Sequence, residues 1–416
     1  MSVILSTRSK IRHVALLASL VAPLACGAGA GEDDATSTAL PVAAAQVPTP
    51  CTATTVFNGN VVIATPQDAV AYRCVSVIRG DLSILSAAGT LYGDVDLSNL
   101  AEVHGDVLLA YAPRVDIPNA LREIRLGKLT AIIRDPPVGT VEARRQPASA
   151  VATPGVSTPP PPQAPYVHGG RLVLSIDFGT RVTGDAAFAL QELSRVDADV
   201  SVEIKGNSPV NYSTLAPPVR ITSGLAKLAT VHGDLRMTVS NSSDYALGNI
   251  TLAPLLSALQ TVDGSVTFRP SKENQWGYRL ALRTIGGDLV VAPTSSGGGG
   301  AWNPAGVFEG VTRVGGAIRV TNQDAFARFS ATATSLAITD GPLGSLSGAP
   351  TVGELRVERD PQLRTLPVDA RVIGSGAIVI RDNASLSQCD VDAFVAKQRS
   401  LGWTGIATTG GNLPCP

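Results

Sequence analysis

The chain has 416 residues, with 33 Lys and Arg against 34 Asp and Glu, and a formal net charge of −1. This balance argues against a nucleic-acid interface, which requires a clear excess of basic residues on one surface. Aromatic residues make up only 4% of the chain, so aliphatic side chains must supply the core, and 41 glycines and 29 prolines predict many turns.

Residues 1–25 have the features of an export signal, because a basic stretch within Arg8–Arg12 precedes an apolar run that ends at Ala25. The run is too short to span a bilayer comfortably. Cys26 follows in a context that resembles a bacterial lipoprotein box, although Pro23 stands where that box normally has Leu. We expect lipidation of Cys26 and anchoring to the bacterial outer membrane or cell surface. Cleavage after Ala30 and secretion is the alternative.

Residues 26–50 are small, polar and Pro-containing, which predicts a flexible tether between the anchor and a folded body at 51–415. The chain has five cysteines, an odd number that lipidation of Cys26 would explain. The other four fall into two close pairs, Cys51 with Cys74 and Cys389 with Cys415. We expect two disulfides, one at each end of the body. Zinc binding is the competing interpretation, but no Cys-x-x-Cys motif or nearby histidine favours it.

One phrase, Leu-x-x-Val-x-Gly-Asp-Leu-x-Val, recurs along the body, and its clearest copy is Leu228–Met237. Further copies are Leu193–Val202 (loose), Leu100–Leu109, Leu259–Phe268, Leu282–Val291 and Val311–Val320. From Val231 to Met237 the apolar positions alternate, which predicts one strand with these side chains facing inward. We expect Gly233 at a position where a side chain would crowd the neighbouring backbone, and we assign Gly127 to a weak copy of that position.

The copies recur at intervals of about 20–45 residues, which is typical of a solenoid. We therefore predict an all-β protein, a parallel β-helix or solenoid of about ten irregular coils. Residues 135–165 contain four consecutive prolines, so we expect a disordered Pro-rich insertion there.

Near the C-terminus the pattern changes to a helical one. Val391 and Phe394 share a helical face, which predicts a short capping helix with Asp390 as N-cap and Gly402 at its end. Before it, Asp360 and Asn383 follow strand patterns, and we expect their side chains to turn the chain by bonding nearby backbone.

Together these features resemble the receptor L-domain-like family of right-handed β-helices with leucine-rich-repeat-like coils, known from receptor ectodomains and fungal cell-wall proteins. The residues that carry the resemblance are Val231–Leu235, Ile285–Leu289, and the turn Arg381–Leu386 followed by Cys389 and the helix. It covers roughly residues 74–415. The resemblance implies a right-handed β-helix with an extracellular binding role, and it implies no catalytic residues and no common ligand.

Two sets of polar residues each recur at a fixed position of the phrase, one before the glycine and one after it. The histidines are His104, His168 and His232, and the acids are Asp81, Asp106, Asp234 and Asp288. The histidines suggest a metal stripe, but a solvent-facing residue copied with its repeat is the stronger interpretation. The acids suggest calcium binding or acid–base catalysis, but a turn or strand-edge role is favoured. We therefore assign no metal, no cofactor and no catalytic residues.

Aromatic residues in loops are the best candidates for ligand binding. Trp276, Tyr278 and Trp302 could stack on a sugar or anchor a protein, or simply cover the edge of a coil. The sequence favours a non-enzymatic envelope recognition or adhesion protein, whose partner is an envelope protein or a polysaccharide. The alternatives are a β-helix carbohydrate-active enzyme and a purely structural envelope lipoprotein.

Overall fold

The structure is a computed structural model, and its chain divides into residues 1–50 and the unit Cys51–Pro416. The described residues are 51, 55–85, 95–111, 123–134, 169–177, 186–206, 221–222, 225–241, 256–269, 280–292, 305–308, 310–321, 326–328, 330–339 and 345–416. The expected signal, Cys26, the tether and the insertion 135–165 therefore lie outside the described residues.

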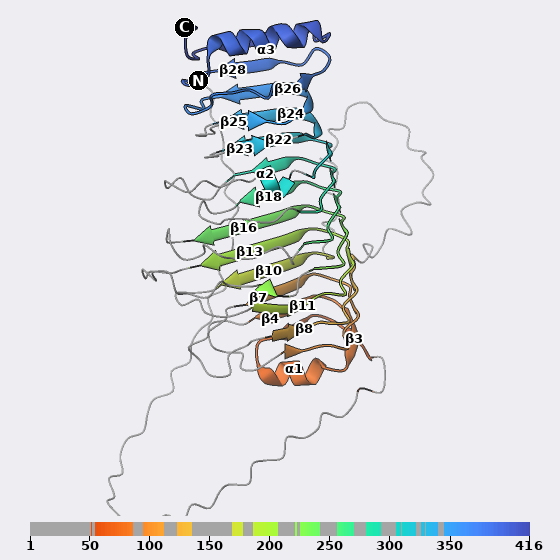
Figure 1. The fold of residues 1–416 in the computed structure, drawn as a ribbon. Helices are drawn as coiled ribbons and strands as arrows, with labels where there is room; N and C mark the ends of the chain where they lie inside the picture. The colour runs from red at the N-terminus through yellow and green to blue at the C-terminus, as the bar shows by residue number, and fades with distance from the viewer. Residues whose placement is uncertain are drawn as a thin grey trace, which may run out of the picture. The chain divides into compact units, whose positions relative to one another are not determined.

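The described unit is built mainly from parallel strands, of which 23 belong to one sheet (Figure 1). Most strands of this sheet follow two ladders that run side by side. The first ladder is β2 (Val61–Ile63), β4 (Leu82–Leu85), β7 (Val107–Tyr111), β10 (Leu172–Asp177), β13 (Val200–Gly206), β16 (Leu235–Asn241), β18 (Val266–Arg269), β20 (Leu289–Val291), β22 (Ala317–Thr321), β24 (Thr332–Thr339), β26 (Thr351–Glu358), β28 (Ile378–Arg381) and β29 (Ala407–Gly410).

The second ladder consists of shorter strands. It is β1 (Thr55–Asn58), β3 (Val75–Arg79), β6 (Glu102–Val103), β9 (Ala131–Ile132), β12 (Arg195–Val196), β15 (Thr230–Val231), β17 (Thr261–Val262), β19 (Thr284–Ile285) and β21 (Arg313–Val314), continued through β24 and β26 to β27 (Arg371–Val372). Smaller sheets are formed by β5 (Val95–Asp96), β8 (Glu123–Arg125), β11 (Ala186–Ala189) and β14 (Ile221–Thr222), and by β23 (Phe326–Arg328) with β25 (Ser345–Ser347). The prediction of an all-β parallel solenoid is confirmed at this level.

The recurring phrase does not form one strand, so that part of the prediction was wrong. Val231 ends β15 and Leu235 begins β16, and His232–Asp234 form a corner between the two ladders. Val231 and Leu235 are both fully buried, because the corner keeps apolar residues on either side of it inside the coil. In β24 and β26 the strand instead runs on through the corner position.

The corner glycines are required by the stacking of the coils. A Cβ on Gly264 would lie 2.5 Å from Asp234 Oδ1 and 2.6 Å from the Gly233 carbonyl oxygen, both in the preceding coil. The predicted crowding is therefore confirmed. Gly127 was wrongly assigned to this position, because the nearest atom to its Cβ would be Gln191 Nε2 at 3.6 Å. Its turn, Leu126–Leu129, belongs to a different part of the coil.

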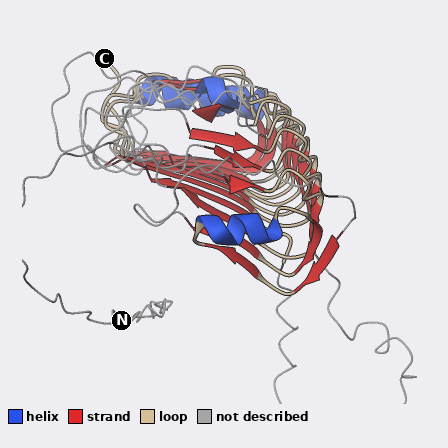
Figure 2. Ribbon diagram, turned by 90° about the horizontal axis from the view of Figure 1, so that it is seen from below, coloured by secondary structure: helices blue, strands red, loops and turns tan. Residues whose placement is uncertain are grey.

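The core is one cluster of mainly aliphatic side chains. Figure 2 shows the stacked strands of the coils, viewed from below. The largest fully buried aromatic side chains, Phe268 and Phe308, meet edge to face with ring centroids 5.4 Å apart. Phe308 ends the short helix α2 (Ala305–Phe308). Aromatic side chains thus fill the core locally, and Val, Leu and Ile fill it elsewhere, as the composition indicates.

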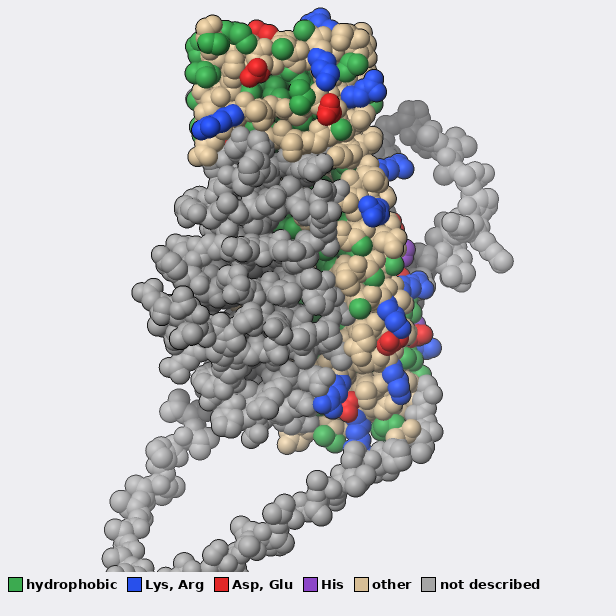
Figure 3. All heavy atoms as spheres, in the orientation of Figure 1, with side chains coloured by type: hydrophobic (Ala, Val, Ile, Leu, Met, Phe, Trp, Pro, Cys, Tyr) green, Lys and Arg blue, Asp and Glu red, His purple; other side chains and the backbone are tan. Residues whose placement is uncertain are grey.

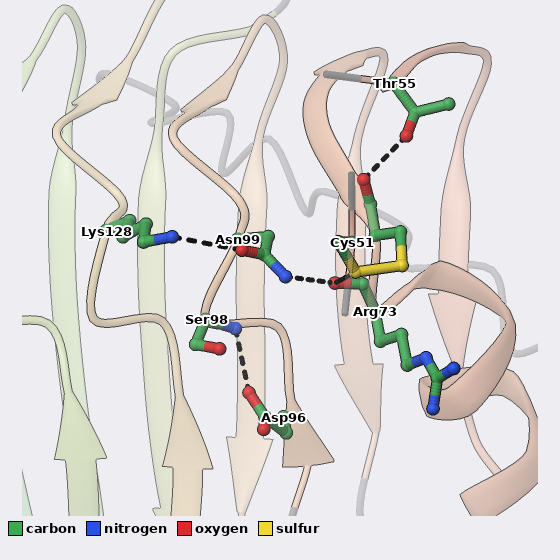
Figure 4. Close-up of a disulfide and its surroundings, with 8 residues drawn as sticks. Cys51, Thr55, Arg73, Asp96, Ser98, Asn99 and Lys128 are labelled. Atoms are coloured by element: carbon green, nitrogen blue, oxygen red, sulfur yellow. Dashed lines mark hydrogen bonds between the residues drawn. A yellow bond between two sulfur atoms is a disulfide. The ribbon is translucent and has the colours of Figure 1, made fainter. Parts of the chain in front are cut away.

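The N-terminal end carries a helix that the sequence analysis missed. Helix α1 (Pro66–Tyr72) begins at a capping box in which Thr65 accepts the Asp68 N–H and Asp68 accepts the Thr65 N–H. Thr-Pro-x-Asp was a readable start signal. The disulfide Cys51–Cys74 follows the helix, and Thr55 Oγ1 donates to the Cys74 carbonyl at 2.6 Å (Figure 4).

The C-terminal end is covered by α3 (Gln388–Ser400), the expected capping helix. Its N-cap is Ser387 and not Asp390, which lies in the first turn, where its charge favours the helix dipole. Gly402 follows the helix with φ +92°, consistent with the predicted stop. The second disulfide joins Cys389 to Cys415, with a Cα–Cα distance of 5.3 Å.

Candidate functional site

Several segments outside the described residues follow the ends of first-ladder strands. The chain leaves the described residues after β7, β10, β13, β16, β18 and β20, at 112–122, 178–185, 207–220, 242–255, 270–279 and 293–304. Because these strands are parallel and in register, their carboxyl ends lie side by side. We call this row of strand ends the loop edge.

The three aromatic candidates, Trp276, Tyr278 and Trp302, lie outside the described residues. The structure does describe the strands from which their segments start. Segment 270–279 follows β18 and segment 293–304 follows β20, and Phe268 pairs with Val291 in the parallel register of these strands. The two segments therefore start from neighbouring positions of the loop edge, on consecutive coils of the sequence.

The insertion that contains 135–165 starts elsewhere, at the corner. The chain leaves the described residues after Arg134 and returns at Gly169, and Arg134 Nε donates to the Gly169 carbonyl at 3.4 Å. The strand pairing continues across this gap, since β7 pairs with β10 and β9 pairs with β12. The insertion thus replaces one corner without shifting the stack.

A ladder of side chains runs along the corner and explains the repeated aspartates. Asp234 Oδ1 accepts the backbone N–H of Ser265 at 2.9 Å in the next coil, and Asp288 Oδ1 accepts that of Ala317 at 2.8 Å. Five further bonds of the same kind join a side-chain oxygen of one coil to a backbone N–H of the next. The oxygen and N–H residues are, in that order, Asn60 and Asp81, Asp81 and Asp106, Asp106 and Arg171, Asp199 and Asp234, and Ser265 and Asp288. These side-chain oxygens link each coil to the next by hydrogen bonds, so a structural role accounts for the repeated aspartates.

Arg171 occupies the corner position that aspartates hold in the neighbouring coils, between Asp106 of the preceding coil and Asp199 of the next. It donates through Nε to Asp106 Oδ2 at 2.9 Å, and the hydrogen bond to Asp106, together with the charges of Asp199 and Asp81, raises the pKa of its guanidinium. An arginine at this point offsets repulsion among stacked carboxylates. Arg171 was not among the predicted site residues, although its place directly after Gly170 was a visible signal.

The corner also carries a cluster of charged groups, which we call the corner cluster: Arg195, Asp197, His232 and Asp263. Asp197, His232 and Asp263 occupy equivalent positions on successive coils. Arg195 donates to both oxygens of Asp197, at 2.6 and 3.0 Å, and His232 Nδ1 lies 2.8 Å from Asp263 Oδ2. Two carboxylates thus flank one imidazole.

The electrostatics of the corner cluster are those of a paired surface group. Burial alone would raise the pKa of Asp197, but hydrogen bonds from Arg195 and from the backbone N–H of Arg134 outweigh it and lower the pKa. Asp197 is therefore held in its charged form beside Arg134, the last described residue before the corner insertion. The sequence analysis missed this cluster, although Arg195 and Asp197 flank the inward Val196 and were recognisable as outward residues.

The two described histidines of the repeat, His104 and His232, do not lie on neighbouring coils. His104 contacts Glu102 at 3.1 Å and is separated from His232 by the coils that carry Ile133 and Asp197, while His168 lies outside the described residues. Within the described ranges, no group of three His, Cys, Asp or Glu side chains is placed to hold a metal ion. In the same ranges, no helix has the length and apolar character needed to cross a membrane.

The described residues define an all-β parallel solenoid with a helix and a disulfide at each end. Comparison of the chain with protein-family models, with curated proteins and with solved structures gives no match.

Proposed function

We propose that the chain is a non-enzymatic recognition or adhesion protein of the bacterial cell envelope, which presents loops from a solenoid to an envelope protein or a polysaccharide. The observation that supports this most is the loop edge, where the insertions start from successive strands of one ladder. Insertions on one face of a solenoid typically form its binding face. The finer fold assignment belongs to the same proposal: a right-handed, receptor L-domain-like β-helix of about ten coils.

The test removes one loop without disturbing the stack. Deleting 293–304 spares β20 and also α2, which begins at Ala305, and Trp302→Ala is the single-residue version. We expect both variants to keep the wild-type unfolding midpoint and to lose binding to whole bacterial envelopes in a pull-down. A matched deletion of 340–344, which follows β24, should leave binding intact. Equal binding by all variants would exclude these aromatic loops, and binding that persists without any loop would favour a purely structural lipoprotein.

We further propose export through residues 1–25 and a lipid anchor on Cys26. Palmitate labelling and membrane fractionation of the wild type beside Cys26→Ser test this directly. Label and membrane association that are lost in the variant support the anchor. An unlabelled wild type would instead indicate cleavage after Ala30 and a secreted protein.

One observation favours a carbohydrate-active enzyme as the second candidate. Asp197 and Asp263 lie two coils apart with His232 between them and Arg195 beside them, and glycoside hydrolysis uses two separated carboxyl groups. If this cluster is catalytic, Asp263→Asn should abolish release of reducing ends from envelope polysaccharide. If the wild type releases none, the recognition proposal stands.

A further inference from the structure

The last strand of the first ladder, β29, has one bonded edge and one open edge. Toward β28, the N–H of Ile378 donates to the Ile406 carbonyl at 3.0 Å, and the N–H of Asp382 donates to the Gly410 carbonyl at 2.9 Å. Successive residues of a strand direct their backbone groups to opposite sides. Ala407 and Thr409 therefore direct theirs away from β28, and among the described residues no strand other than β28 pairs with β29.

The open edge lacks most of the features that keep sheet edges apart. Edges are usually protected by charged side chains, prolines, bulges or a covering element. Residues 400–416 contain no Lys, Arg, Asp or Glu, and β29 itself contains no proline. Thr408 and Thr409 are exposed. Strand shortness is a protective feature that β29 does have, and α3 packs beside the strand.

Apolar side chains flank this edge in place of charges. Ile406 is 76% exposed and Leu413 is 48% exposed, the former directly before β29 and the latter shortly after it. Figure 3 shows hydrophobic side chains gathered at this end of the body. An exposed apolar rim beside an unpaired strand indicates a surface that is covered by a partner.

The strand is complementary to itself. When two copies run antiparallel about Thr408, Ala407 of one faces Thr409 of the other, and these are the residues whose backbone groups point to the open edge. In the same register Ile406 faces Gly410, which has no side chain, and Thr408 faces its own copy. The large Ile406 side chain opposite Gly410, and Thr408 opposite its own copy on the axis, both suit cross-strand pairing in an antiparallel ladder.

We propose that β29 pairs antiparallel with β29 of a second copy of this chain, which forms a tail-to-tail homodimer across a twofold axis at Thr408. A twofold interface must be self-complementary, and the absence of charge at 400–416 lets two identical edges approach without repulsion. The pairing is short, so association depends on concentration. It places the two Cys51 ends away from the interface, because Cys51 precedes the first coil and β29 belongs to the last.

Sedimentation of the full chain over a concentration series tests the dimer, with Cys26→Ser as the common background to prevent thiol cross-linking through that residue. We expect the background chain to pass from monomer to dimer as its concentration rises. Thr408→Lys brings two ammonium groups together on the axis and should abolish the dimer. Val62→Lys, at a residue that is 51% exposed on β2 in the first coil, should leave the dimer unchanged.

A second variant keeps the proposal testable if Thr408→Lys impairs folding. In the same background, Thr408→Cys should form an intermolecular disulfide with its own copy under mild oxidation by dissolved oxygen, whereas Val368→Cys, at a residue that is 71% exposed, should not. A chain that is monomeric at every concentration overturns the proposal. So does a folded Thr408→Lys variant that dimerises like its background, or equal cross-linking from both cysteine variants.

Discussion

Gln398 on α3 takes the place of a strand neighbour for Val372. Its Oε1 accepts the Val372 N–H at 2.9 Å, and its Nε2 donates to the Ala370 carbonyl at 3.0 Å. The Gln398 side chain is fully buried. Its amide thus presents the donor and acceptor that a further coil would have offered to β27, and the second ladder ends with its backbone groups satisfied.

Replacing Gln398 by Leu should destabilise the protein strongly. The substitution leaves a buried N–H and a buried carbonyl without partners, and each such group costs about 1–3 kcal/mol. The free energy of unfolding, measured with urea with both disulfides intact, should fall by that order. The control is Gln362→Leu, because that side chain is exposed. Equal unfolding midpoints for the two variants would contradict the proposed cap.

Gly264→Ala should destabilise the protein because its Cβ would meet Asp234 and the Gly233 carbonyl at 2.5 and 2.6 Å. Overpacking of this kind costs about 1–3 kcal/mol when the obstacle includes backbone. Gly127→Ala is the matched control, with its nearest atom at 3.6 Å and no left-handed φ. Thermal unfolding followed by circular dichroism should separate the two, and a stable Gly264→Ala protein would show that the coils can move apart.

The corner ladder predicts an order among substitutions of Asp288. Asp288→Asn keeps an oxygen for the Ala317 N–H and loses the ion pair with Arg319, whereas Asp288→Ala loses both. The alanine variant should therefore be the less stable by about 1 kcal/mol, which is the net value of one hydrogen bond. Denaturant midpoints measure the difference. If asparagine were as damaging as alanine, the ion pair and not the backbone bond would hold the corner.

Glu358 predicts a pH dependence of stability. Burial of this carboxyl opposes ionisation, but hydrogen bonds from Arg356 and Arg381 outweigh it, so the pKa in the folded protein lies below the ordinary value of 4.5. A carboxyl with a lowered folded pKa stabilises the protein above its unfolded pKa, and this contribution is lost as the pH falls through the folded pKa. The stability advantage of the wild type over Glu358→Gln should thus be largest above pH 4.5 and shrink below it.

Urea unfolding across an acidic pH series measures this advantage. Glu354→Gln is the companion variant, because Glu354 also binds Arg356 but has a side chain that is 40% exposed. Its effect on stability should be small at every pH, as is usual for exposed ion pairs. A constant difference between wild type and Glu358→Gln down to the most acidic pH would contradict the lowered pKa.

The turn residues show how far local pattern reaches. Asp360 was predicted to bond nearby backbone, and its Oδ1 accepts the N–H groups of Gln362 and Leu363, both at 3.2 Å. Leu363 is fully buried, so the apolar residue after the turn does return to the core. For Asp360 this prediction succeeds because an Asx turn involves only residues that are close together in the chain. For Asn383 it was wrong, because that side chain accepts the Asp360 N–H and donates to the Val357 carbonyl, both in the preceding coil.

The corner shows where local pattern stops. Alternation from Val231 to Met237 is compatible with one strand, and only the pairing of β15 with β17 and of β16 with β18 separates it into two. The bend depends on how Gly233 fits against Ala198 and Asp199 of the preceding coil, which are distant in the sequence. The corner cluster has the same origin, since His232 and Asp263 meet only because their coils stack.

The sequence by itself determined which side chains are apolar and alternate, where the coils recur, which cysteines could pair and where a helix ends the body, because these depend on period and composition. The tertiary structure alone decided that the phrase bends, that β7 joins β10 across the corner insertion, and that Gln398 completes β27. These features rest on hydrogen bonds between groups distant in sequence, whose partners are defined only once the coils are stacked.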